Sequence, residues 1–396
     1  MDFNAIHSLL TRAVETVTPA AQIVVWQHGN VQLEAAYGWL DPETRRRPTQ
    51  PDTLFDMASV SKLFTVAAFM TLVEAGRVAL DQPVRTVLPE FDGPRPIQPY
   101  EDPLRPGALV EVQRGSLTAD AGAVTFRRLL THTSGLPAWR PLWQQADAAA
   151  ARRMALETFF AYPPGTRILY SDIGLILLGM SLERLTGQPL DVAIGERVIA
   201  PLGLTHTGYL PLPVDPCQQL TANIAPTEFC AWRGRRIVGE VHDENAWRLG
   251  GIAGHAGIFS TAADIAAFGQ CFLDHGTPIL RAETVAEMTR VQAEFEGLRR
   301  GLGFALWSAD PEASSNPFSP RTFGHTGFTG TCLWVDPERD LVVAFLTNEV
   351  YHGREGRGIG PLRVTLHRLI VQEVDMSLRR TAGNENASST GDGIPA

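Results

Sequence analysis

A serine and a lysine three residues apart, Ser59 and Lys62, could form an activated nucleophile. On a helix this spacing places both side chains on one face, close enough for the amine and the hydroxyl to share a proton. Serine is inert at its own pKa, whereas a partly buried lysine can lose its proton near neutral pH and act as a base. The pair therefore indicates nucleophilic catalysis at Ser59, and a chance match to so short a motif is the alternative.

Lys62 is the only lysine among the 34 lysine and arginine residues of the chain. Arginine supplies a permanent cation wherever one is needed, but it cannot release its proton near neutral pH. Lysine can release it when its surroundings disfavour the charge. The composition thus favours a position that needs a tunable amine, and a leftover surface lysine is the alternative.

Motifs of other catalytic systems are missing from the sequence. It contains no Gly-x-Ser-x-Gly elbow, no His-Glu-x-x-His and no P-loop. Two histidines and two acids, His242, His255, Asp243 and Glu244, could be imagined as metal ligands, but they lack the paired spacing of zinc sites. We therefore expect neither a metal nor a cofactor.

The composition limits the partners of the chain. Its 396 residues are 44% hydrophobic and carry a net charge of -9, which argues against nucleic acid and against an anionic membrane surface. A small molecule or a peptide is the expected partner, and the oligomeric state stays open. No apolar run is long enough to span a membrane and the first residues lack a signal-peptide pattern, so a cytoplasmic protein is expected. Four cysteines without paired spacing predict reduced, mostly buried thiols.

Hydrophobic periodicity predicts strands near both ends of the chain and helices between them. Residues 21–27 and 31–37 are expected to form a hairpin across 28–30. Further strands are expected at 302–307, 330–335 and 341–347. The predicted helices are 3–17, 59–74, 125–130, 146–161, 171–185, 190–199 and a final one from Pro361. The helix at 59–74 is apolar nearly all round, so it should be buried.

This order predicts an α/β plus α architecture of two lobes. An antiparallel sheet flanked by helices is built from both chain ends, 1–75 and 240–380, and an all-helical lobe, 76–239, is inserted between them. A proline- and glycine-rich stretch at 92–122 is interpreted as a surface insertion, and 381–396 as a disordered tail. The cleft between the lobes is the expected site.

Three ordered motifs resemble those of the serine β-lactamase and penicillin-binding protein superfamily. They are Ser59-Val60-Ser61-Lys62, the run from Pro163 that ends in Tyr170-Ser171-Asp172, and His325-Thr326-Gly327. The branch looks like class C β-lactamases, D,D-carboxypeptidases and family VIII esterases, and the likeness extends over roughly residues 20 to 350. It implies the β-lactamase/transpeptidase-like fold, again with no cofactor.

The resemblance implies a role for each matching residue. Ser59 would be the nucleophile, with Lys62 and Tyr170 managing the protons, and which of the two is the general base stays open. His325 would polarise the site, and Thr326 of the His-Thr-Gly motif, which continues through Gly327, would bind a substrate carboxylate. The backbone amides of Ser59 and Phe328 would form the oxyanion hole.

Two departures from the common motifs bear on the substrate. Asp172 stands where an asparagine is usual, and a carboxylate beside Lys62 would favour the ammonium form and raise its pKa. The run 241–246, followed by the glycine-dense run 250–257 that contains His255, looks like a subgroup associated with muropeptide work. Such a loop can bring backbone close to a ligand, so His255 is a candidate substrate-binding residue; a purely structural turn is the alternative.

Together these features predict a serine hydrolase that acts through a Ser59 acyl-enzyme on an amide or an ester. A cell-wall peptide or muropeptide, cleaved by a carboxypeptidase or an amidase, is the favoured substrate. A carboxylesterase like those of family VIII and a non-catalytic penicillin-binding module are the alternatives.

Overall fold

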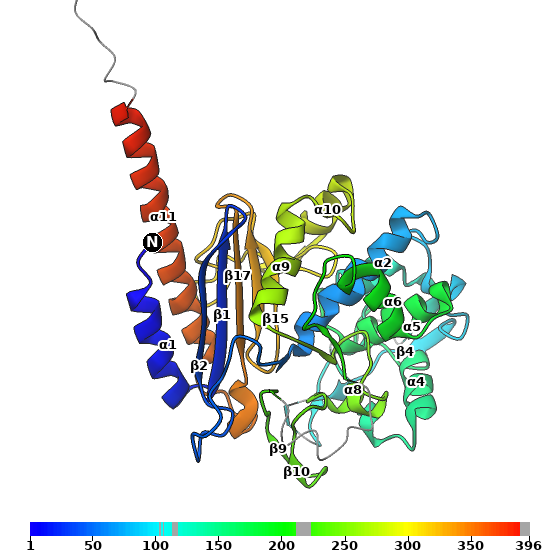
Figure 1. Ribbon diagram of the computed structural model, residues 1–396. Helices are drawn as coiled ribbons and strands as arrows, with labels where there is room; N and C mark the ends of the chain where they lie inside the picture. The colour runs from blue at the N-terminus through cyan, green and yellow to red at the C-terminus, as the bar shows by residue number, and fades with distance from the viewer. Residues whose placement is uncertain (103, 106, 113–117, 211–222, 389–396) are drawn as a thin grey trace, which may run out of the picture.

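Strands from both ends of the chain form one eight-stranded antiparallel sheet, as expected from the sequence (Figure 1). The computed structural model describes residues 1–102, 104–105, 107–112, 118–210 and 223–388, without the side chains of 381–388. The strand order is β12 (Ala293–Phe295), β13 (Leu298–Arg300), β14 (Ala305–Leu306), β15 (Phe323–Thr326), β16 (Cys332–Asp336), β17 (Leu341–Thr347), β1 (Ala20–Gln27) and β2 (Asn30–Gly38). The predicted α/β plus α fold class is confirmed.

Helices cover both faces of the central strands. Alternate residues of β1 point to opposite faces, so Ile23 and Val25 pack with α1 and α11, whereas Val24 joins the core beneath α9. Because both faces are covered, β1 and β17 are buried almost throughout and mostly apolar, rather than alternating between buried and exposed residues. The covering helices are α1 (Asn4–Thr16), α9 (Ala262–Leu273) and α11 (Ile359–Ser388), and Figure 1 shows α9 opposite the other two.

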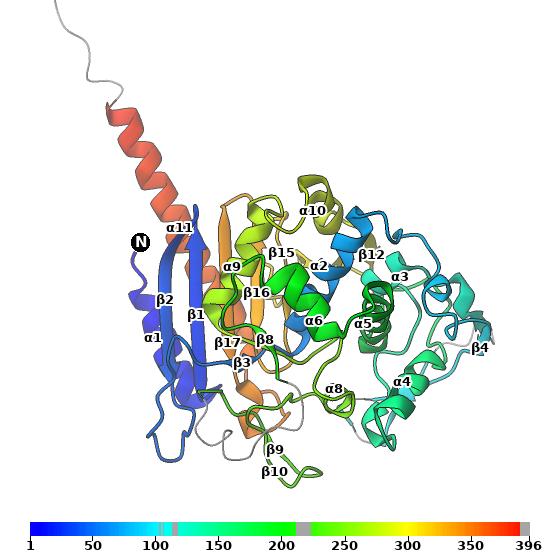
Figure 2. The same ribbon diagram turned by 45° about the vertical axis from the view of Figure 1, so that its right-hand side comes forward.

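The helix that follows Ser59 lies between the sheet and the other helices. Figures 1 and 2 show α2 (Ser61–Glu74) in this central place, where it packs against α5 and α6. A helix with apolar residues on every side needs such surroundings. The remaining helices are α3 (Phe126–Leu130), α4 (Ala148–Leu156), α5 (Asp172–Thr186), α6 (Leu190–Ile194), α8 (Glu244–Arg248) and α10 (Ala282–Thr289). The lobe boundary predicted at residue 75 lies directly after this helix.

Short strands outside the large sheet pair with one another in several loops. Three of them form a small antiparallel sheet, β3 (Phe55–Asp56), β11 (Ile258–Ser260) and β8 (Gly208–Tyr209). The others form the hairpin of β9 (Phe229–Cys230) with β10 (Arg235–Arg236), and the pairs β4 (Pro94–Pro96) with β7 (Thr118–Asp120) and β5 (Tyr100–Glu101) with β6 (Leu109–Val110). The stretch 92–122 is therefore partly paired, and Ile97 and Tyr100 within it are buried in the core; 103, 106 and 113–117 lie outside the described residues.

Several predicted elements differ in extent from the structure. The helix expected at 146–161 ends at Leu156. The strand expected at 302–307 is reduced to β14, because the chain turns at Gly303, whose φ is 79°. Helix α11 continues through 381–388, the first part of the tail that the sequence predicts to be disordered; residues 389–396 lie outside the described part. Adding turns to an established helix needs no new nucleation, which allows a polar segment to extend it.

Two further expectations concern membrane-spanning segments and the cysteines. Within the described residues, no helix is both long and apolar enough to cross a membrane. Cys230, Cys271 and Cys332 are free and buried, as predicted, and Cys217 lies outside the described residues.

Candidate active site

Ser59 lies in a tight turn at the start of α2. The turn is a single 3-10 segment, Ala58–Val60, so the α-helix itself begins two residues after Ser59 rather than at it. Ala58 has a φ of 45°, a left-handed conformation that L-residues adopt at a cost. Its amide donates a 2.8 Å hydrogen bond to the buried carboxylate of Asp56, which holds this backbone in place. The chain thus stores strain directly before the candidate nucleophile.

Lys62 occupies the centre of a buried hydrogen-bonded cluster. Its side chain is 1% exposed, and Nζ lies 2.8 Å from Oγ of Ser59, 2.7 Å from Oδ1 of Asp172 and 3.0 Å from the carbonyl oxygen of His255. An ammonium group has three hydrogens to donate, and these three acceptors match that number. The spacing of Ser59 and Lys62 therefore brings the amine and the hydroxyl into hydrogen-bond contact, as expected from the sequence.

The surroundings of Lys62 favour its charged form. Burial by itself lowers the pKa of Lys62, but the carboxylate of Asp172, together with Tyr170, outweighs burial and the pKa is raised above its usual value. The predicted effect of Asp172 on Lys62 is confirmed in direction. A lysine held as an ammonium positions Ser59 well but must lose its proton before it can act as a base.

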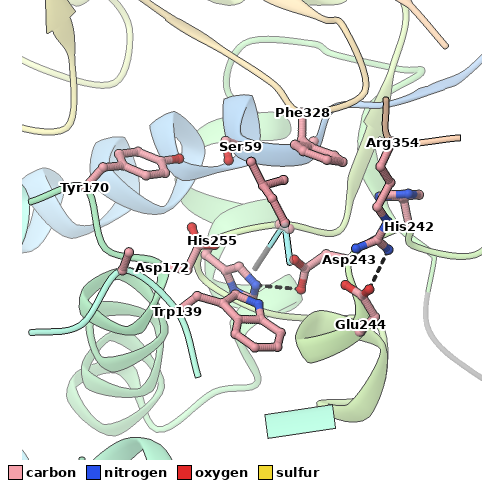
Figure 3. A pocket seen from close by; sticks show the side chains of 14 residues that line it. Ser59, Trp139, Tyr170, Asp172, His242, Asp243, Glu244, His255, Phe328 and Arg354 are labelled. Carbon is pink, nitrogen blue, oxygen red and sulfur yellow. Dashed lines mark hydrogen bonds and ion pairs between the residues drawn. The ribbon is translucent and has the colours of Figure 1, made fainter. Parts of the chain in front are cut away.

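Tyr170 stands beside this pair. Its ring centroid lies 4.9 Å from Nζ of Lys62, and Figure 3 shows its hydroxyl pointing towards Ser59. The hydroxyl has no hydrogen-bond partner in the described part of the chain, so it is available to a substrate or water. Burial raises the pKa of Tyr170 above its usual value, although the Lys62 cation opposes the shift. Neither Lys62 nor Tyr170 is thus a ready base near neutral pH.

The His-Thr-Gly motif ends β15 and lies against the turn of Ser59. A side chain at Gly327 would collide with Thr331 and approach the carbonyl oxygen of Met57 to 2.6 Å, which explains the glycine. His325 is buried, and burial together with the nearby cations Lys62 and Arg300 lowers its pKa to about 3. It is therefore a neutral ring, with Nδ1 2.7 Å from the carbonyl oxygen of Thr326.

Two cavities meet at Ser59. We call the first, of about 280 Å³, the acidic cavity because its wall contains Asp172, Asp243 and Glu244 (Figure 3). The second, of about 510 Å³, is the basic cavity because its wall contains Arg299 and Arg300. Ser59, Tyr170 and Phe328 line both cavities. A substrate can thus extend to either side of the nucleophile.

The glycine-dense run combines structural and site contacts. Gly254 packs so closely on α5 that a Cβ atom would collide with the carbonyl oxygen of Leu175, and Gly257 has a φ of 117°. A structural role in close packing and in the turn therefore explains these two glycines. The same loop nevertheless brings the His255 carbonyl to Lys62. His242 is bonded locally, with Nε2 3.2 Å from Glu228.

Sequence reasoning missed Arg300 as a site residue. Its guanidinium lies 5.5 Å from the ring centroid of Tyr170 and lines the basic cavity. Burial lowers the pKa of Arg300, which remains a cation because an arginine pKa starts so high. Arg299 and Arg300 follow each other on β13, and nothing in their local sequence marks the second as facing the site.

Replacing Asp172 with asparagine should move the pH dependence of catalysis. The substitution removes the negative charge that raises the pKa of Lys62, so burial would lower it, and the pKa of Tyr170 would fall as well. We therefore expect the rise of kcat/KM with pH to move to lower pH, by about one pH unit. The measurement is a pH–rate profile with a chromogenic ester. Asp147→Asn, at the exposed start of α4, is the control, and an unmoved profile for Asp172→Asn would contradict the assignment.

The chain is similar to one protein-family model, to curated relatives and to solved structures. The family model described as Beta-lactamase matches residues 6–364. The chain is 32% identical over 377 residues to an N-acetylmuramyl-L-alanine amidase of Bacillus subtilis, with 87% of this chain and 80% of the relative covered. It is 33% identical over 383 residues to a putative D-alanyl-D-alanine carboxypeptidase of Escherichia coli, with coverages of 87% and 82%. The octameric penicillin-binding protein homologue from Pyrococcus abyssi has a similar fold, with a TM-score of 0.66, 22% identity and coverages of 92% and 78%.

Proposed function

Because the chain belongs to the beta-lactamase family and is a serine hydrolase of that family, we propose that it cleaves an amide bond of a cell-wall peptide through an acyl-enzyme on Ser59. The observation that carries the proposal is the 2.8 Å contact between Oγ of Ser59 and Nζ of Lys62 at the junction of two cavities. A nucleophile bonded to a lysine that can accept its proton once the amine is unprotonated, with room for substrate on both sides, is the arrangement that acyl transfer needs.

The proposed reaction has two steps. Oγ of Ser59 attacks the amide carbonyl while its proton passes to Lys62 or Tyr170 in the unprotonated form. The amides of Ser59 and Phe328 stabilise the oxyanion, and the C–N bond breaks as the leaving nitrogen takes up the proton. Water then attacks the ester on Ser59 and gives a proton to the same base, and the base returns this proton to Oγ as the ester C–O bond breaks and the acid leaves.

The basic cavity supports a substrate whose leaving group carries a carboxylate. Thr326 and Arg300 both line it, and a guanidinium forms strong charge-assisted hydrogen bonds with a carboxylate. The relative named as a D-alanyl-D-alanine carboxypeptidase has a name that denotes removal of such a residue. We therefore favour hydrolysis of the last peptide bond of a carboxylate-ended peptide. The bond implied by the name of the other relative, a muramyl amide, is the alternative.

The test compares a peptide ending in D-Ala-D-Ala with its C-terminal amide. We expect the wild-type protein to prefer the free carboxylate, and Arg300→Gln to lower kcat/KM for that peptide by about 10- to 100-fold, with little change for the amide. Arg290→Gln, at an exposed arginine just before β12, serves as the control. Equal rates for the two peptides would contradict a carboxylate-binding Arg300. Faster cleavage of a muramyl-L-alanine substrate would favour the amidase alternative.

A further inference from the structure

The wall of the acidic cavity contains three carboxylates, Asp172, Asp243 and Glu244, and one arginine, Arg354. Two of its three carboxylates already have cationic partners. Lys62 is bonded to Asp172, and Arg354 forms an ion pair with Glu244. The same guanidinium also lies 2.7 Å from Glu228, so one cation serves two carboxylates. Within the described residues, the third carboxylate, Asp243, forms no ion pair with a lysine or an arginine; its partner is His255.

Asp243 uses one of its two oxygens. Within the described residues, its contacts are made by Oδ1, which accepts hydrogen bonds from the amide of Ala246 at 2.7 Å and from Nε2 of His255 at 2.8 Å. Oδ2 is left for a ligand. The buried position raises the pKa of Asp243, but His255, the amide of Ala246 and Lys62 outweigh burial and lower it, so the group is a carboxylate.

His255 contributes a second polar atom to the wall of the acidic cavity. It lines the acidic cavity and is 1% exposed, and its Nδ1 has no partner in the part of the chain that the structure describes. The tautomer with hydrogen on Nε2 fits these contacts, because that nitrogen donates to Asp243 and Nδ1 then needs no acceptor. Within the described residues, His255 therefore leaves Oδ2 of Asp243 free and presents Nδ1, an atom without a partner, on the same wall.

We propose that the acidic cavity binds a primary ammonium group on the acyl portion of the substrate, with Oδ2 of Asp243 as its anchor. The inference rests on the proposed function and names its substrate class, a peptide with a free amine on the N-terminal side of the bond that is cleaved. Trp139 and Phe328 also line the cavity, and aromatic faces attract ammonium groups. With the basic cavity on the other side of Ser59, the substrate would be oriented by opposite charges at its two ends.

A divalent metal ion fits the same groups less well. Asp172, Asp243 and His255 bring ligand atoms within 4.8 Å of one another. Oδ1 of Asp172 is bonded to the ammonium of Lys62, and Nε2 of His255 is bonded to Oδ1 of Asp243. A metal ion held by these three groups would lie close to the buried cation of Lys62, which repels it. An organic ammonium needs only Oδ2 of Asp243.

The test uses two peptides that differ in one charge. Both end in D-Ala-D-Ala; one carries lysine before these residues, and the other carries Nε-acetyl-lysine. We expect the wild-type protein to have a kcat/KM about 10-fold or more higher for the free amine. Asp243→Asn should bring the ratio of the two values close to one. A ratio of rates cancels changes in the chemical step that both peptides share, including any effect of Asp243 on Lys62.

Asparagine at position 243 should preserve the fold, since it also caps helices well and Asp243 caps α8. The matched control is Asp340→Asn, which removes a carboxylate from another aspartate–histidine pair, with His28, at the exposed turn between β16 and β17. The control should keep the preference. A wild-type ratio near one, with both peptides hydrolysed, would overturn this inference and leave the proposed function intact. Failure to hydrolyse either peptide would overturn both.

Discussion

Ser59→Ala is expected to form no covalent adduct with a penicillin and to lose about 10⁴-fold or more of kcat/KM towards a chromogenic ester or a peptide. Without Oγ no acyl-enzyme can form, and only the weak catalysis of the binding site remains. The loss should be chemical rather than structural, because Lys62 keeps its contacts with Asp172 and the His255 carbonyl. Intact mass measured over time would show one added penicillin on the wild-type protein and none on the variant.

The neighbouring serine of the same motif provides the control. Ser61 is buried and its Oγ accepts a 3.2 Å hydrogen bond from the amide of Ile258, so it is a structural residue. Ser61→Ala should cost about 1–2 kcal/mol of stability and still form the adduct. An adduct on Ser59→Ala would show that another group is the nucleophile. A persistent wild-type adduct would mark a penicillin-binding protein, whereas rapid loss of the adduct would mark a β-lactamase.

The parts of the fold that local patterns specify were predictable. The hairpin of β1 and β2 follows from two β-rich runs joined by a short turn, and the structure pairs Gln27 with Asn30 at that turn. The buried helix α2 follows from apolar residues on all its sides, and it ends before Gly76, whose φ of 66° suits a C-cap glycine. Both signals lie within about twenty residues of sequence. The pairing of β1 with β17 needed the further argument that both chain ends build one sheet.

The shorter elements could not be predicted in the same way. Strands of two or three residues, such as β14 and the pairs within 92–122, have too few positions for any periodicity to be visible. Their extent depends on partners distant in sequence. The left-handed backbone of Ala58 is a further case, since alanine gives no local preference for that conformation and the bond to Asp56 maintains it.

The candidate site likewise contains residues that a local motif identifies and residues that only the tertiary structure identifies. Ser59, Lys62 and Asp172 could be selected because their motifs are local, and their mutual contacts follow from the approach of α5 to the start of α2. Arg300 could not be selected, because one of 33 arginines has no distinguishing local signal and only the hairpin of β12 and β13 brings it to Tyr170. Asp243 was noticed as a possible metal ligand. Its contact with His255 and its place in the cavity wall required the tertiary structure.

Lys62→Arg is expected to lower the rate of acylation by about 10³-fold or more, although the charge beside Asp172 is kept. Arginine cannot release its proton, so it can neither accept the proton of Ser59 nor return it to the leaving group, and the larger guanidinium must enter a site where Lys62 is 1% exposed. Single-turnover acylation by a chromogenic ester measures the loss, and the thermal unfolding midpoint shows whether the variant is folded. Because the pKa of Lys62 is raised, a larger fraction of its amine is unprotonated, and able to act as a base, as the pH rises. Wild-type acylation should therefore accelerate with pH, while the arginine variant stays slow throughout. If a folded Lys62→Arg variant acylated at the wild-type rate, Lys62 would only position Ser59, and Tyr170 would have to move the proton alone.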